Sequence, residues 1–174
     1  MKGKGIIFLD IFICLFVTIV VAFIMLNIIF PLKYKNTILA CANQNQVGSE
    51  LVASIIFTES RFNPSAKSSK GACGLMQLLP STAKAFYKGD KDYSDDMLFD
   101  PEINIKIGVS YLKYLFDKYQ DEVTVLACYN AGEGKVLEWK GQAGVLKKSQ
   151  IPYRETLNYV NKVQKIKKYY KFKI

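Results

Sequence analysis

Apolar residues are concentrated near the start of the chain. From residue 6 to residue 30 the sequence is apolar except for Asp10, Thr18 and Asn27. At about 1.5 Å per residue, a helix of this length covers the ~30 Å hydrocarbon core of a bilayer. The pattern predicts a short cytoplasmic tail (residues 1–5), one transmembrane helix (residues 6–30) and a linker (residues 31–36). The chain would then be a single-pass protein of the cytoplasmic membrane.

A cleaved signal peptide is the alternative interpretation of this run. The run is longer than the apolar core of a typical signal peptide, and no small-residue cleavage site follows it directly. Ala40-Cys41-Ala42, or the lipoprotein-like stretch ending at Cys41, has suitable residues but lies beyond the linker. An uncleaved anchor is therefore favoured. Lysines flank both ends, so charge does not fix the orientation, and the simplest choice places the remaining domain outside.

Beyond residue 37 the apolar positions recur at helical spacing, with almost no strand pattern. Leu51, Val52, Ile55 and Ile56 predict one helix, capped by Ser49 and ended by Asn63-Pro64. A short helix is expected over residues 82–87, then a polar loop over residues 89–98.

The second half continues the helical pattern. Asp100-Pro101-Glu102 is a strong helix start, and the buried stripe that follows should comprise Ile103, Ile107, Tyr111, Tyr114 and Leu115. Further helices are expected from residue 123 to a break at residues 130–132, and over residues 156–170. The fold class is therefore all-α: a compact helical domain (residues 37–174) behind one transmembrane helix.

Charge is the next feature that changes the picture. The chain has 24 Lys and Arg against 15 Asp and Glu, and the last thirteen residues hold six lysines: Lys162, Lys165, Lys167, Lys168, Lys171 and Lys173. Such a tail can attract a polyanion, or it can be a solvated helix end whose lysines suit the helix dipole. We do not expect nucleic acid as a partner, because no recognisable nucleic-acid-binding motif accompanies the tail.

The residue types also limit the chemistry. There is no histidine, which excludes Ser-His-Asp and Cys-His catalysis and imidazole metal sites. The four cysteines, Cys14, Cys41, Cys73 and Cys128, form no Cys-x-x-Cys pair, so we expect no zinc site. Cys73 and Cys128 are best interpreted as small buried residues, although a disulfide between them is possible. Catalysis would have to use carboxylates, hydroxyls, amides or lysine.

Glu59 is the outstanding candidate, because it ends an apolar helical run. It follows Ile55 and Ile56 by four and three residues, so it should lie on the face that those side chains bury. Desolvation and the negative end of the helix dipole would both raise its pKa. A carboxylic acid that is neutral near pH 7 can serve as a general acid. The alternative is a rim carboxylate paired with Arg61 or Lys67.

Three motifs around Glu59 resemble the lytic transglycosylases of the soluble-transglycosylase type, relatives of goose-type lysozyme. The first runs from Glu59-Ser60-x-Phe62-Asn63-Pro64 through Gly74-Leu75-Met76-Gln77 to Pro80-x-Thr82-Ala83. The second is Tyr129-Asn130-Ala131-Gly132, and the third is Glu155-Thr156-x-x-Tyr159-Val160. They occur in the family's order and cover most of residues 37–165, so a lysozyme-like helical domain is expected.

The resemblance implies a site and a reaction. Glu59 would be the single catalytic acid and then base, and the groove that binds peptidoglycan glycan strands would be lined by Ser68, Met76, Gln77, Tyr129, Asn130, Glu155 and Tyr159. Amides and hydroxyls suit sugar hydroxyls and N-acetyl groups, while Met76 and Tyr129 offer apolar faces. The cleavage that the resemblance implies joins O6 of N-acetylmuramic acid to its own C1, and it uses no water, no metal and no cofactor. A muramidase that uses water, or a noncatalytic glycan-binding module, remains an alternative.

Overall fold

A computed structural model describes residues 2–90, 92–141 and 144–174. It divides the chain into two units, residues 1–32 and 33–174. The first is the helix α1 (Lys2–Ile29). Its 21-residue segment Leu9–Ile29 is long enough and apolar enough to cross a membrane. α1 begins within the predicted tail of residues 1–5, whose first residue lies outside the described part.

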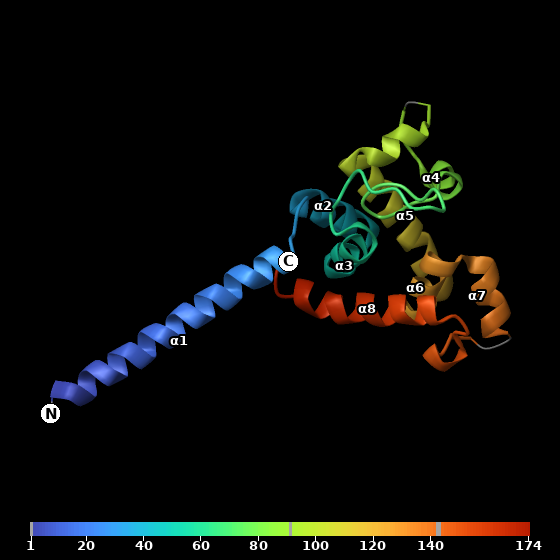
Figure 1. The fold of residues 1–174 in the computed structure, drawn as a ribbon. Helices are drawn as coiled ribbons and strands as arrows, with labels where there is room; N and C mark the ends of the chain where they lie inside the picture. The colour runs from blue at the N-terminus through green and yellow to red at the C-terminus, as the bar shows by residue number, and fades with distance from the viewer. Residues whose placement is uncertain (1, 91, 142–143) are drawn as a thin grey trace. The chain divides into compact units, whose positions relative to one another are not determined.

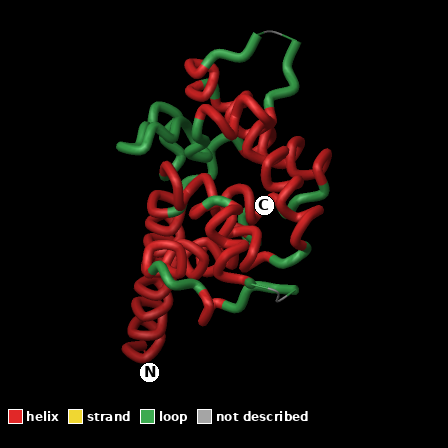
Figure 2. Tube along the Cα trace, turned by 90° about the vertical axis from the view of Figure 1, so that its right-hand side faces the viewer, coloured by secondary structure: helices red, strands yellow, loops and turns green. Residues whose placement is uncertain are grey.

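The second unit is all-α, as predicted. Figure 2 shows helices joined by loops, and within the described ranges the only β-type pairings are two isolated bridges, Lys67 with Cys73 and Cys73 with Leu78. The helices are α2 (Lys35–Asn45), α3 (Ser49–Ser60), α4 (Pro80–Phe86), η1 (Asp95–Phe99), α5 (Pro101–Tyr119), α6 (Glu122–Ala131), α7 (Glu133–Lys140), η2 (Lys148–Gln150) and α8 (Arg154–Tyr170).

α8 is the helix against which the site is assembled. It packs against both α3 and α6 (Figure 1). Its buried side chains, among them Tyr159, Val160 and Val163, face the apolar side of α3, where Val52, Ile55 and others are fully buried. Burying such side chains contributes on the order of 2 kcal/mol each, so this contact fixes how α3 presents Glu59.

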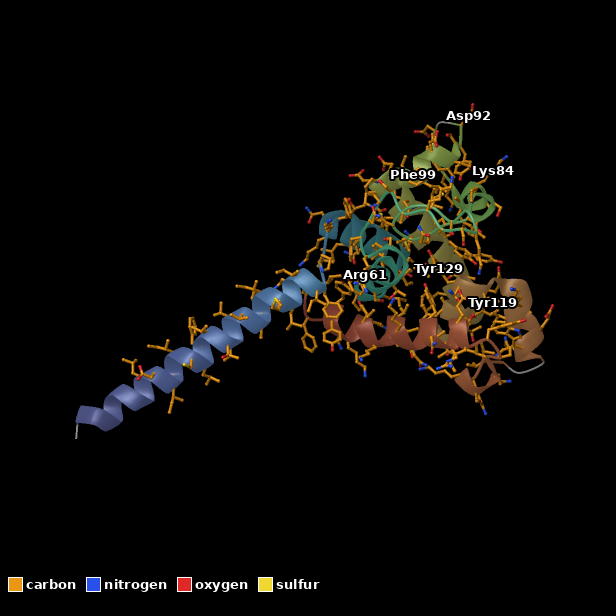
Figure 3. The ribbon with its side chains drawn as sticks, viewed as in Figure 1. Arg61, Lys84, Asp92, Phe99, Tyr119 and Tyr129 are labelled. Carbon is orange, nitrogen blue, oxygen red and sulfur yellow. The ribbon has the colours of Figure 1, made fainter. Side chains whose placement is uncertain are left out.

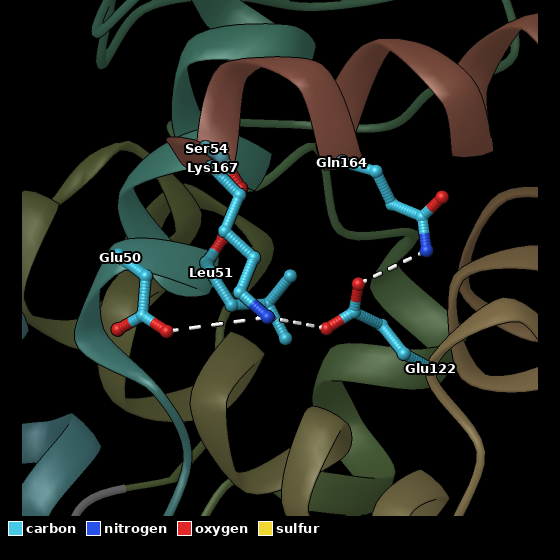
Figure 4. Close-up of polar contacts among 6 residues, drawn as sticks. All are labelled: Glu50, Leu51, Ser54, Glu122, Gln164 and Lys167. Atoms are coloured by element: carbon cyan, nitrogen blue, oxygen red, sulfur yellow. Dashed lines mark hydrogen bonds and ion pairs between the residues drawn. The ribbon is translucent and has the colours of Figure 1, made fainter. Parts of the chain in front are cut away.

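A polar contact at one side of α8 ties three helices together. Lys167 of α8 donates to Glu122 of α6 at 2.5 Å and lies 4.0 Å from Glu50 of α3, while Gln164 donates to the other oxygen of Glu122 at 3.1 Å (Figure 4). Because Glu122 and Glu50 both lie in the first turns of their helices, the helix dipoles also favour their negative charges. The network fixes the relative positions of α3, α6 and α8.

Helix ends follow the predictions in part. The start at Asp100 is confirmed, since its Oδ1 accepts a hydrogen bond from the Ile103 amide at 2.9 Å. The cap prediction at Ser49 is wrong: Ser49 is the first helical residue, Gly48 precedes it, and no side chain caps that end. α3 also ends earlier than expected, at Ser60, because Arg61 adopts the left-handed conformation (φ 51°).

The stripe predicted for α5 is partly wrong. Ile107 and Leu115 are buried, but Tyr114 is exposed, and the fully covered positions include Asn104 and Gly108. α5 packs against α2 on one side and α6 on another, so its buried face is wider than a single stripe. The loop predicted over residues 89–98 contains η1 near its end, and Lys91 lies outside the described part.

Candidate active site

The segment from Arg61 to Leu79 turns back on itself at the end of α3. Arg61 and Phe62 both have positive φ values, which reverse the chain immediately after Glu59 and Ser60. Cys73 and Leu78 exchange backbone hydrogen bonds at 2.9 and 3.0 Å, and the Ser60 hydroxyl donates to the Leu75 carbonyl at 2.8 Å. The segment is therefore attached to the same turn of α3 that carries Glu59.

Asn104 of α5 holds this segment from below. It is fully buried, accepts the Met76 amide at 2.8 Å, and donates to the Cys73 and Leu98 carbonyls at 3.1 and 2.8 Å. The backbone at Gly74 (φ +77°) lies so close to the backbone at Leu98 that a Cβ on Gly74 would lie 2.0 Å from the Leu98 oxygen. Only glycine fits at this position.

Gln77 and Tyr129 are both anchored to the backbone of the same segment. The Gln77 amide donates to the Ala66 and Gly74 carbonyls at 3.0 and 2.9 Å. The Tyr129 hydroxyl, from the C-terminal part of α6, donates to the Met76 carbonyl at 2.8 Å. These bonds fix side chains whose remaining surface faces a cleft; Figure 3 labels Tyr129 and, at the end of α3, Arg61.

Glu59 is partly exposed and close to two tyrosines. Burial raises the pKa of Glu59 to about 7, against the opposing effects of the Tyr159 hydroxyl and the Lys162 charge. The Tyr159 hydroxyl is buried and makes no well-aligned hydrogen bond within the described part of the chain, although it lies near enough to the carboxyl to affect that pKa. Burial first, and then the Glu59 charge, also raise the pKa of Tyr129 and of Tyr159. The expected raised pKa is thus present, with burial as its largest cause.

The alternative interpretation of Glu59 as a paired rim carboxylate receives no support. The ion pairs of the described residues do not join Glu59 to Arg61 or to Lys67. Arg61 instead places its guanidinium 5.7 Å from the centre of the Phe57 ring.

A cleft of about 430 Å³ lies between the segment before α4, the end of α6 and the start of α8. Four residues predicted from the sequence line it: Gln77, Tyr129, Asn130 and Glu155. Glu59 is not one of the lining residues. Its charge nevertheless raises the pKa of Tyr129, and Tyr129 does line the cleft. Tyr129 is therefore the residue that links Glu59 to the cleft.

The other three predicted residues lie around the cleft rather than along it. Ser68 closes a turn, accepting the Ala72 amide on its hydroxyl at 3.0 Å. Met76 is fully buried, and its sulfur occupies the space above Gly108, where a Cβ would lie only 2.3 Å away. Tyr159 is buried beside Glu59. The contact of Met76 with the cleft residues is made by its backbone carbonyl, which accepts the hydrogen bond from the Tyr129 hydroxyl.

Sequence reasoning missed several lining residues, notably Lys70, Thr82, Tyr111, Lys135 and Tyr153. Tyr111 was expected in the buried stripe of α5, and its ring packs 5.4 Å from that of Tyr129. Lys135 lies 5.7 Å from the centre of the Tyr153 ring. α7, which carries Lys135, was not predicted. The hydroxyl of Tyr111 is the sequence feature that could have indicated its place at the cleft, because a fully buried apolar position does not require a polar group.

The cysteines take no part in this arrangement. All four are free thiols, and Cys41, Cys73 and Cys128 are buried. Burial raises the pKa of the Cys41 thiol and brings that of Cys128 to about 12, so both remain protonated near neutral pH. Cys73 and Cys128 are small buried residues, as expected, and they do not form a disulfide.

An all-α domain with one desolvated glutamate beside a cleft of tyrosines and amides fits the lysozyme-like helical domain that the three motifs indicated. The sequence profile described as "Transglycosylase SLT domain" matches residues 36–152. The chain therefore belongs to the Transglycosylase SLT domain family, as the three motifs indicated.

Individual relatives agree with this assignment. The chain is 36% identical to the soluble lytic murein transglycosylase of Escherichia coli (strain K12) over 152 residues, covering 82% of this chain and 24% of that protein. It is 32% identical over 167 residues to the membrane-bound lytic murein transglycosylase C of Histophilus somni, covering 80% and 46%. This chain thus spans only about a quarter of the first relative's length.

Solved structures give the same picture. The 70 kDa soluble lytic transglycosylase of Escherichia coli matches with a TM-score of 0.78 and 35% identity, over 84% of this chain and 25% of that one. An inactive glutamate-to-glutamine mutant of the lytic transglycosylase Slt of Pseudomonas aeruginosa matches with a TM-score of 0.75 and 32% identity, over 82% and 24%. The domain therefore has the lysozyme-like lytic transglycosylase fold.

Proposed function

We propose that this protein is a membrane-anchored lytic transglycosylase that cleaves peptidoglycan glycan strands between N-acetylmuramic acid and N-acetylglucosamine without water. The observation that carries the proposal is Glu59, whose desolvated carboxyl has a pKa of about 7 next to a cleft that Tyr129 lines. A group with that pKa is protonated in a large fraction of molecules near neutrality and can both give and take a proton. The names of the relatives, lytic murein transglycosylases, support the same reaction class.

The proton transfers balance on this one residue. The Glu59 carboxylic acid protonates the glycosidic oxygen as the bond from C1 of the muramyl residue breaks, and the N-acetylglucosamine unit leaves as an alcohol. The substrate's N-acetyl group assists at C1. The Glu59 carboxylate then removes the proton of the muramyl C6 hydroxyl, whose oxygen bonds to C1 and leaves a 1,6-anhydro end. Glu59 returns to its acid form, and no cofactor is consumed.

The remaining predicted residues would bind and orient the glycan. Gln77, Asn130 and Glu155 line the cleft with amide and carboxylate groups that suit sugar hydroxyls and N-acetyl groups, and the Tyr129 ring offers an apolar face. Ser68 and Met76 would act through the conformation of the segment that bears Gln77. Tyr159 would tune the Glu59 carboxyl from its buried side.

Hydrolysis is the rival reaction, and Glu155 gives it a specific basis. An inverting glycosidase needs a second carboxylate to activate water, and Glu155 places a carboxylate at the same cleft. In that reaction Glu155→Gln would abolish cleavage as fully as Glu59→Gln. In the proposed reaction Glu155→Gln weakens substrate binding and leaves the anhydro product.

The anchor is the second part of the proposal. α1 has the length and composition of a membrane span, and a relative is named as membrane-bound. We infer that residues 6–30 remain attached and cross the cytoplasmic membrane once, with residues 37–174 outside. Mass analysis of the mature protein checks this, because a mature N-terminus at or near Cys41 would contradict it.

Product analysis tests the chemistry. The full chain, purified in detergent, is incubated with peptidoglycan in water enriched in heavy oxygen, and the released fragments are analysed by mass spectrometry. We expect 1,6-anhydro-muramyl ends without heavy oxygen, and no release by Glu59→Gln. Reducing ends that carry heavy oxygen would assign the chain to hydrolysis instead.

A further inference from the structure

The C-terminal end of α8 and the residues after it form an exposed, basic and aromatic surface that the proposed reaction does not use. From residue 156 to residue 174 the chain has six lysines and no acidic residue. Phe172 is 90% exposed and Tyr169 42% exposed. Exposed aromatic rings beside lysines are the combination of side chains found where a helix meets a membrane surface.

The positive charge of this surface is largely uncompensated. A cleft of about 530 Å³ along α8 is lined by five lysines, namely Lys148, Lys165, Lys167, Lys168 and Lys171. Its only carboxylate is Glu122, which Lys167 already holds at 2.5 Å. The ion pairs of the described ranges include none that involves Lys165, Lys168 or Lys171. The field of these lysines therefore extends into solvent, where it attracts anions.

The short connecting segment limits how far this surface can lie from the end of the apolar run. Lys35, the first residue of α2, donates from its Nζ to the Lys173 carbonyl at 2.8 Å, so the C-terminus of the domain lies against its first helix. Only residues 30–34 separate Lys35 from the end of α1, so that Lys35 is the sixth residue after it. Six residues span at most about 20 Å. The lysines therefore lie within reach of the surface of any bilayer that α1 crosses.

We propose that the C-terminal end of α8 and the residues after it, comprising Lys168, Tyr169, Lys171, Phe172 and Lys173, dock on the anionic lipid headgroups of the membrane that α1 spans. This inference rests on the proposed anchoring. Lysines near an anionic leaflet each add roughly fivefold to binding, and aromatic rings favour the headgroup level. Anionic lipids are preferred to a soluble acidic polymer because the surface lies at the tethered end of the domain and carries exposed aromatic rings.

Docking would fix the height of the site above the membrane. Tyr159, beside Glu59, precedes Lys168 by nine residues on α8, which corresponds to about 14 Å along the helix axis. With the basic end held at the headgroups, α8 would act as a spacer that keeps Glu59 away from the lipid. The enzyme would then cut glycan strands within a limited distance of the bilayer.

A tryptophan probe tests this inference in the full chain. Trp139 is the only tryptophan; it packs against Tyr153, which precedes the first turn of α8, far from Phe172. The chain carrying Trp139→Phe and Phe172→Trp is placed in lipid nanodiscs whose acyl chains are brominated, which quenches nearby tryptophan fluorescence. We expect strong quenching in discs with phosphatidylglycerol, and little quenching with phosphatidylcholine alone or in high salt. The unmodified chain, with Trp139, is the matched control and should not be quenched.

Charge removal completes the test. Changing Lys168, Lys171 and Lys173 together to Gln should lower the docking equilibrium about a hundredfold, at roughly fivefold per lysine, and should relieve the quenching. Equal quenching in both lipids, or none in a chain that is incorporated in the discs, would overturn the docking and leave the anchoring intact. Failure of the chain to enter discs at all would overturn the proposed anchoring and this inference with it. In every case peptidoglycan cleavage is measured separately.

Discussion

Two glutamates in this domain, Glu59 and Glu133, lie in contrasting environments. Burial raises the pKa of Glu59 to about 7, because only the Tyr159 hydroxyl and the Lys162 charge oppose it. Burial also acts on Glu133 in α7, but there the Lys118 amine and the Tyr119 hydroxyl both donate to its Oε1 at 2.7 Å. These contacts lower the pKa of Glu133 below its usual range.

The two sites differ both in depth and in partners: Glu59 is the more strongly desolvated of the two, whereas Glu133 has an ion pair with Lys118. A carboxylate that receives a cation and a hydroxyl is kept charged and joins two helices, in this case α5 and α7. A carboxyl that is desolvated without an ion pair is kept available for proton transfer. The environment at the end of α3 therefore favours a protonated carboxyl, whereas the cation and the hydroxyl at Glu133 favour a charged carboxylate that joins two helices.

Exchange of each glutamate for glutamine should give the largest contrast. Glu59→Gln should lower peptidoglycan cleavage by roughly a hundredfold to ten-thousandfold or more, because the amide cannot transfer a proton. Glu133→Gln should cleave at nearly the wild-type rate. Turnover and a thermal melt are measured on the same samples. Near wild-type release of anhydro products by Glu59→Gln would contradict the assignment.

The pH dependence of stability should differ in sign for the two sites. A raised pKa means that the folded state holds a proton that the unfolded state releases, so stability is greatest below the ordinary value of 4.5 and falls as pH rises to about 7. This loss amounts to up to about 3 kcal/mol. Glu133, with its lowered pKa, contributes stability above its usual pKa that is lost as pH falls.

Denaturant unfolding between pH 4 and pH 8 separates the contributions of Glu59 and Glu133 to the free energy of unfolding. The fall in stability between about pH 4.5 and 7 should disappear in Glu59→Gln and persist in Glu133→Gln. A wild-type curve that is flat over this window would contradict the environment assigned to Glu59.

Tyr159→Phe sharpens the comparison at the reactive site. The hydroxyl lowers the pKa of Glu59, so its removal should move the alkaline limb of the pH–rate profile upward, by less than about one pH unit. The melting temperature should change little, because this hydroxyl makes no well-aligned hydrogen bond within the described residues. A limb that moves downward would show that the hydroxyl acts in another way.

The smallest effect is expected at the structural site. Glu133→Gln should cost about 0.5–1 kcal/mol of unfolding free energy, since the ion pair with Lys118 is partly exposed. Urea titrations measure it, and Lys118→Gln serves as the matched control that should cost about the same. A loss of several kcal/mol would mean that the junction is less solvated than its exposure indicates.

The sequence predicted the fold class and the environment of Glu59 because both depend on local spacing. Helical periodicity places Glu59 on the face of Ile55 and Ile56, and burial of that face is the main cause of its raised pKa. α2 and α7 escaped prediction. α7 is short and begins after Gly132 (φ +87°), so its sequence carries little periodic signal.

Tertiary contacts could not be read from local spacing. Asn104 lies on a face expected to be apolar, and its partners Cys73, Met76 and Leu98 come from distant segments. The Tyr129 hydroxyl likewise bonds a carbonyl 53 positions earlier in the chain. Such pairings depend on how α5 and α6 pack, which the pattern of apolar positions does not fix.

The protonation state of Glu59 is the central claim, and it can be observed without substrate. The full chain, labelled with carbon-13 at the glutamate side-chain carboxyls, is titrated by NMR, and Glu59→Gln identifies the signal that disappears. We predict a midpoint of about 7 for that signal. A midpoint near 4.5, the ordinary value for glutamate, would mean that Glu59 is a charged surface carboxylate and would remove the basis for its role as the general acid.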